Sequence, residues 1–139
     1  FYALYTDKVI AVEKASGRLY TYLTLLVAGS ALAIYNQGGF GVGHILAVLT
    51  LIALASGVSM EKTKLFGSSS KYLQALAYTS TLLFHMIPAI TDFLRRLPVG
   101  DPFIDSFEDP LLLNFYIAFL LIFVAGIIAQ MCWLKRQAN

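Results

Sequence analysis

Four long stretches of hydrophobic residues alternate with short polar segments along this chain. A helix that crosses a bilayer needs about 20 mostly apolar residues, and each stretch is close to that length. The second and fourth contain no Lys, Arg, Asp or Glu, which argues against buried helices of a soluble domain. The pattern predicts an all-α integral membrane protein, one antiparallel bundle of four transmembrane helices within residues 1–139. The predicted spans are about 19–35, 40–60, 72–91 and 111–134.

Residues 1–18 are too polar to cross a bilayer. Aromatic and β-branched side chains recur among them, and Lys8 and Lys14 lie between. This pattern favours a short N-terminal helix in the membrane interface, with the lysine side chains extended toward water. An alternative interpretation makes the segment the end of a preceding span.

The composition agrees with lipid as the solvent. Hydrophobic residues make up 58% of the chain and charged residues 13%, whereas soluble domains average roughly 45–50% and about 25%. The chain has one cysteine, Cys132, so an internal disulfide is excluded. Its place near the end of the last apolar stretch predicts a buried, unreactive thiol.

Lysine and arginine are distributed unevenly between the two sides of the predicted bundle. One side carries Arg95 and Arg96 only. Short segments rich in Lys and Arg stay on the cytoplasmic side of a membrane. We therefore expect a multi-pass protein of the bacterial inner (cytoplasmic) membrane with both termini cytoplasmic and the loop 92–110 outside. The cytoplasmic side would hold the other eight cations, Lys8, Lys14, Arg18, Lys62, Lys64, Lys71, Lys135 and Arg136.

The two histidines of the chain, His44 and His85, both fall inside apolar stretches. An ionisable residue within a membrane helix is a hypothesis for a functional site. The short connection makes the second and third spans antiparallel neighbours, so the two imidazoles would lie at similar depth near the outer face. A polar stripe that includes His85 should face the bundle interior. Its residues are Gln74, Tyr78, Thr81, His85 and Asp92.

These residues leave several interpretations open. In the simplest, each imidazole bonds to a backbone carbonyl or to interfacial water. In another, His44 and His85 are the axial ligands of haem b in an electron-transfer protein. A third makes the chain a small transporter or a quinone-site protein that works through His85 and Tyr78, with Thr81 as a second hydroxyl. A non-haem metal would need a further ligand, and the sequence offers Asp92 or Asn114 near that face.

Motifs that carry catalysis are missing from the sequence. It has no glycine-rich phosphate loop, no His-Glu-x-x-His and no Ser or Cys nucleophile with an evident base. The sequence therefore predicts a non-catalytic protein, an accessory or assembly subunit of a larger membrane complex. Its expected partners are the lipid bilayer and other membrane-protein subunits, and no nucleic acid.

Two motifs lie within residues 14–60. One is Gly17, Arg18, Leu19 and Tyr20 at the start of a predicted helix, and the other is His44, Leu46, Ala47, Thr50, Leu51 and Gly57 in the next. With these motifs the segment resembles an uncharacterised family of bacterial multi-span membrane proteins. The chain departs from the family where it has Glu13 and Lys14, and again at Ser68–Lys71, because the family tends to carry histidines there. The resemblance implies a membrane location and no particular chemistry.

Overall fold

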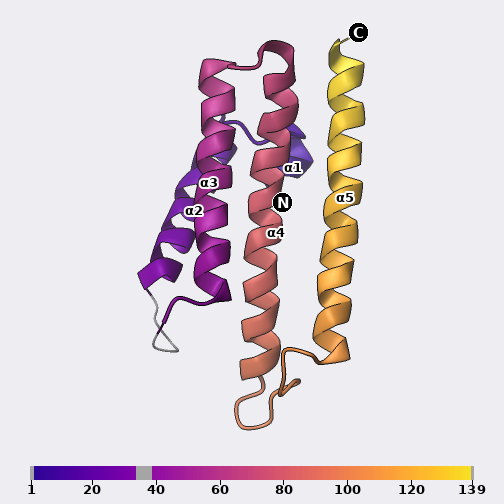
Figure 1. Ribbon diagram of the computed structural model, residues 1–139. Coiled ribbons are helices and arrows are strands. Elements are labelled where there is room, and N and C mark those ends of the chain that lie inside the picture. Colours follow the sequence, from indigo (N-terminus) through magenta and orange to yellow (C-terminus); the bar gives the residue numbers. More distant parts are fainter. Residues whose placement is uncertain (1, 34–38, 139) are drawn as a thin grey trace.

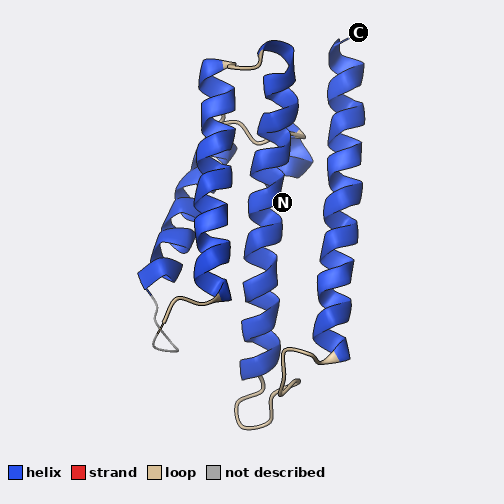
Figure 2. Cartoon of the chain, in the orientation of Figure 1, coloured by secondary structure: helices blue, strands red, loops and turns tan. Residues whose placement is uncertain are grey.

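The computed structural model describes residues 2–33 and 39–138, and these ranges contain helices and loops but no strand (Figure 2). The all-α prediction is therefore confirmed. Three helices are long and apolar enough to cross a membrane, and they correspond to the second, third and fourth predicted spans. The elements are α1 (Tyr2–Asp7), α2 (Ala15–Ala33), α3 (Val42–Thr63), the 3₁₀ turn η1 (Gly67–Ser69), α4 (Ser70–Arg96) and α5 (Pro110–Ala138).

Helix α2 is the first predicted span, and its described part is not among the three helices that are apolar enough to cross a membrane. Arg18, Tyr20 and Tyr22 lie in its first half, and its described residues do not reach the hydropathy that marks the other spans. The end of this predicted span and the turn after it fall on residues 34–38, outside the described residues.

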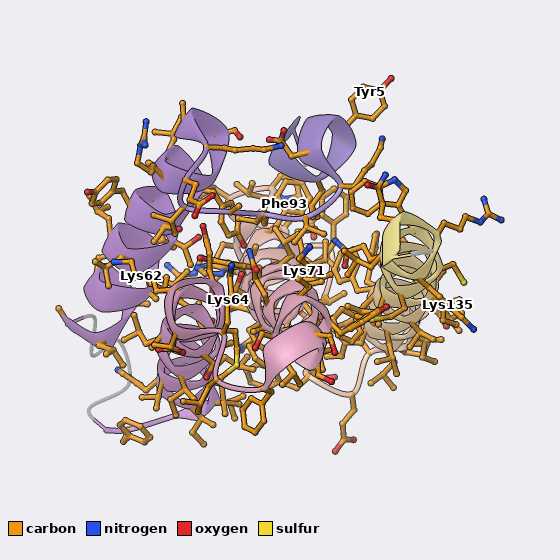
Figure 3. All side chains as sticks on the ribbon, turned by 90° about the horizontal axis from the view of Figure 1, so that it is seen from above. Tyr5, Lys62, Lys64, Lys71, Phe93 and Lys135 are labelled. Atoms are coloured by element: carbon orange, nitrogen blue, oxygen red, sulfur yellow. The ribbon has the colours of Figure 1, made fainter. Side chains whose placement is uncertain are left out.

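Successive long helices run antiparallel and form a shallow arc in the order α2, α3, α4 and α5 (Figures 1 and 3). Helix contacts join α2 to α3, α3 to α4, and α4 to α5. Helix α5 therefore closes one end of the arc, and α4 is the long helix on which it packs. The N-terminal segment occupies the concave side of the arc (Figure 3).

Close packing between α3 and α4 follows from small residues on the inward face of α3. Its buried positions recur every three or four residues, as expected for one face of a helix. Gly57 lies against the Tyr78 ring, so a Cβ at this position would come within 3.0 Å of that ring. A glycine here lets the aromatic side chain lie flat on the neighbouring backbone. The buried positions of α3 are His44, Ala47, Thr50, Leu54 and Gly57.

The N-terminal segment does not continue as one helix along the edge of the arc. Residues 8–13, which we call the N-terminal plug, follow α1 and enter the arc. Helix α1 ends at Asp7, and the chain turns at Lys8, which has a positive φ of 63°. Ile10 is then only 1% exposed and packs with Leu54 and Tyr78 in the core. The prediction of a short N-terminal helix is confirmed, but the sequence pattern did not reveal that the residues after it enter the core.

Charge separates the two ends of the molecule, because antiparallel helices bring alternate connections to the same end. The end with η1 and the C-terminus holds eight cations and three acids, a net charge of +5. Figure 3 looks onto this end and labels four of its lysines. The opposite end holds two cations and five acids, a net charge of −3.

Cys132 is exposed, so the prediction of a buried thiol is wrong. It lies on α5, which among the described long helices packs on α4.

Candidate functional site

Two of the predicted site residues, Tyr78 and Thr81, lie at the centre of a polar cluster between three helices. Both side chains are fully buried on α4. The Thr81 hydroxyl is hydrogen-bonded to the hydroxyl of Tyr20 on α2. The Tyr78 hydroxyl donates to a carboxylate oxygen of Glu61 on α3 at 3.4 Å. The inward polar stripe predicted for the third span is thus confirmed at these positions.

The hydroxyls of this cluster already have partners within the chain. Thr81 Oγ1 donates to the backbone carbonyl of Tyr78 at 2.6 Å. A threonine hydroxyl has one hydrogen, so the hydroxyl of Tyr20 must be the donor to Thr81. The rings of Tyr20 and Tyr78 pack edge to face with centroids 6.5 Å apart, and Gly57 closes the other side of Tyr78. This arrangement packs three helices together and leaves the Tyr78 side chain fully buried.

His85 lies one turn beyond Thr81 on α4 and is half-buried. Its Nδ1 is 2.8 Å from the backbone oxygen of Thr81. A carbonyl oxygen can only accept, so Nδ1 carries the proton and the Nε2 lone pair is directed away from that bond. The His85 ring is therefore oriented by its own helix, with Nε2 able to accept a hydrogen bond or to ligate a metal.

His44 is buried and forms a cap at the start of α3. Its Nδ1 accepts the backbone N–H of Gly41 at 3.1 Å, and its ring stacks on Phe40 with centroids 5.2 Å apart. In the neutral ring this bond places the proton on Nε2. Neither nitrogen then offers iron a lone pair, because one is protonated and the other is used in the cap. The structure thus gives the two histidines opposite tautomers and attaches each to its own helix.

The other residues considered for a metal lie on the surface near the acidic end. Asp92 pairs with Arg96 across one helical turn at 3.3 Å, as their spacing predicts, and both side chains are mostly exposed. Asn114 is exposed on α5. Among the described residues, no three or more His, Cys, Asp or Glu side chains come together in a way that could hold a metal ion.

Sequence reasoning placed Gln74 on the inward stripe but missed the contacts that hold the N-terminal plug in place. We call Glu61, Gln74 and Gln130 the polar clamp. Gln74 Nε2 donates to the Ile10 carbonyl at 2.9 Å, and Gln130 Nε2 donates to the Lys8 carbonyl at 2.8 Å. The Glu61 carboxylate accepts the backbone N–H groups of Val12 and Glu13 at 2.9 and 3.0 Å. Three helices thus satisfy backbone groups that lipid would leave unsatisfied.

A half-open pocket lies between α1, α4 and α5 at the cation-rich end of the molecule. Its volume is about 370 Å³, and its lining is mostly apolar. Thr79 and Gln130 form its inner wall and are hydrogen-bonded to each other at 2.8 Å. The sequence carried one signal for this place, because Gln130 is an isolated amide within a long apolar stretch. The lining residues are Leu4, Lys8, Thr79, Gly126, Ala129, Gln130 and Trp133.

Comparison of the chain with models of protein families, with curated proteins and with solved structures finds no match. The resemblance over residues 14–60 therefore stays a prediction.

Proposed function

We propose that this protein is a non-catalytic accessory or assembly subunit of a larger complex in the bacterial inner membrane. In this proposal α2, α3, α4 and α5 all span the bilayer, both termini are cytoplasmic, and the loop 92–110 faces outward. The distribution of Lys and Arg supports the orientation. Three helices that are long and apolar enough to cross a membrane support the location.

The observation that carries the proposal is the one-sided packing of α5. Within its most apolar window only 6% of the residues are buried, against 28% in the corresponding windows of α3 and α4. Each helix of a closed four-helix bundle has two long neighbours, whereas α5 packs on one described long helix, α4, and meets the short N-terminal segment near its cation-rich end. The free side of α5 is a surface on which a helix of another subunit can pack.

Small residues on the exposed surface of α5 support the same conclusion. Ala118 and Ala125 are exposed and lie seven residues apart, which places them near one face of the helix. Membrane helices associate through small residues because these allow their backbones to approach closely. This face of α5 therefore has the character of a helix–helix interface.

The proposal of a non-catalytic protein is supported by the way in which its interior polar groups are hydrogen-bonded. The hydroxyls of Tyr20, Tyr78 and Thr81 bond within the chain, and the clamp residues bond to backbone groups of the N-terminal plug. A catalytic site would need polar groups directed into a space that a substrate can enter. These polar groups instead join the helices and the N-terminal plug to one another.

Native electrophoresis of membranes solubilised in mild detergent tests the proposal. We expect the protein to comigrate with a larger assembly. Ala125→Leu adds bulk to the proposed face of α5 and should weaken the comigration, whereas Ala55→Leu on the exposed surface of α3 is the matched control and should leave it unchanged. A stable monomer with no copurifying partner would refute the proposal. If both variants comigrate like the parent protein, α5 is not the interface.

A visible spectrum of the same preparation distinguishes the accessory-subunit proposal from the alternative that this chain is a b-type haem protein. Because His44 uses Nδ1 in its cap, we expect no Soret or α-band change between the reduced and oxidised samples, even after expression with ample haem. A change that disappears in His85→Ala would favour the b-type cytochrome and would contradict a purely structural role.

A further inference from the structure

We propose that the pocket between α1, α4 and α5 binds one anionic phospholipid, with an acyl chain in the pocket and the phosphate at Lys8. This inference depends on the membrane location proposed above and adds a ligand to it. The pocket volume of about 370 Å³ lies within the range of roughly 300–1,000 Å³ that is usual for small-molecule sites.

The inner part of the pocket suits a hydrocarbon chain because its polar groups are already bonded. Gln130 accepts from Thr79 through Oε1 and donates to the Lys8 carbonyl through Nε2. A polar ligand would have to compete with these bonds. Gly126 and Ala129 contribute no bulk, and nothing lies within 4 Å of a Cβ built on Gly126. The space above Gly126 is therefore open and apolar.

The rim of the pocket suits an anionic headgroup. Lys8 lies at the rim and is exposed, and its Nζ donates to the Tyr5 carbonyl at 2.7 Å. An ammonium group has three N–H donors, so two remain for a phosphate. The rim belongs to the end of the molecule with a net charge of +5, and basic pockets on the cytoplasmic side of membrane helices bind anionic lipid headgroups.

The depth of the pocket matches a lipid that enters from the interface. Trp133 and Gly126 both line it and are seven residues apart on α5, which corresponds to roughly 10 Å along the helix. Tryptophan is typical of the headgroup level of a membrane. The pocket therefore extends from headgroup depth into the hydrocarbon, as one acyl chain does.

Trp133 is the single tryptophan of the chain, so its fluorescence reports directly on this pocket. The protein is reconstituted in phosphatidylcholine vesicles that contain a fixed fraction of dibrominated phosphatidylglycerol or of dibrominated phosphatidylcholine. Bromine quenches the indole on contact. We expect the anionic brominated lipid to quench Trp133 at a mole fraction about fivefold lower than the zwitterionic one needs.

Two pairs of variants separate the pocket from general membrane contact. Lys8→Gln should remove the preference for the anionic lipid, whereas Lys62→Gln, at the same end of the molecule but on α3, should keep it. Gly126→Leu should fill the pocket and also remove the preference. Gly43→Leu is its control, because a Cβ there likewise meets nothing within 4 Å.

The outcomes distinguish failure of the lipid site from failure of the membrane proposal. Equal quenching by both brominated lipids, unchanged by the variants, would overturn the lipid site and leave the membrane location intact. No quenching by either lipid, together with failure to incorporate into vesicles, would overturn both. Emission that is insensitive to bromine but changes with the protein-to-lipid ratio would also overturn the lipid site, because a second copy of the chain would then cover Trp133.

Discussion

Gly17 shows how strongly one residue determines the architecture at the cation-rich end. It is buried at the start of α2, and a Cβ built on it would lie 1.8 Å from the backbone oxygen of Ala11. The backbone of the N-terminal plug therefore touches the backbone of α2 at this point. Any side chain at position 17 would force the plug away from the helix.

Gly17→Ala should destabilise the protein, because the clash is with backbone and no side chain can rotate to relieve it. Overpacking of this kind costs about 1–3 kcal/mol or more, which should lower the midpoint of thermal unfolding in mild detergent by several degrees. Gly29→Ala on the same helix is the control, since nothing lies within 4 Å of its Cβ. An equal midpoint for both variants would contradict the close approach.

At the scale of elements, the N-terminal plug is held by side chains rather than by its own secondary structure. The clamp residues bond to the backbone of residues 8, 10, 12 and 13. Lys14 and Ser16 both bond to Asp7, at 2.6 and 2.7 Å, and close the turn between α1 and α2. Removing one clamp residue should therefore loosen the plug without unfolding the long helices.

Gln74→Leu keeps the bulk of the side chain but leaves the buried Ile10 carbonyl without its donor. An unsatisfied buried group costs about 1–3 kcal/mol, so amide hydrogens of residues 8–13 should exchange on the order of tenfold faster. Hydrogen exchange followed by mass spectrometry measures this change. The exposed Gln137→Leu is the control. If α3 and α4 lose protection as much as residues 8–13 do, the plug is not a separate element.

At the scale of the whole molecule, the separation of charge determines how the protein would sit in a bilayer. The ends carry net charges of +5 and −3, and the arc of antiparallel helices keeps them apart (Figure 1). The acidic end is also ordered by side-chain packing. Leu94, Ile104 and Leu112 form a cluster there, and the Arg95 guanidinium lies 4.0 Å from the centre of the Phe107 ring.

Cysteine labelling of intact cells tests the proposed orientation. Cys132 is first replaced by Ser, and Val99→Cys or Ser68→Cys is then added, because both positions are exposed in opposite connections. We expect a membrane-impermeant maleimide to label position 99 in intact cells and position 68 only after permeabilisation. The reverse pattern would show that the termini are outside.

The sequence by itself determined the helices, their order and the sidedness of charge. These follow from local composition, because a long apolar stretch must satisfy its own backbone hydrogen bonds and short connections must alternate between two ends. The inward placement of Tyr78 and Thr81 also followed from helical periodicity.

Only the tertiary structure decided what the polar residues bond to. The positions of His44 and His85 along their helices could be read from the chain, but their bonds could not, because each imidazole depends on the geometry of its own helix. The clamp joins residues up to 122 positions apart, and no local pattern encodes such a contact. The one-sided packing of α5 and the exposure of Cys132 likewise depend on which helix faces meet. Apolar composition does not determine those faces, because the same side chains can contact either lipid hydrocarbon or a neighbouring helix.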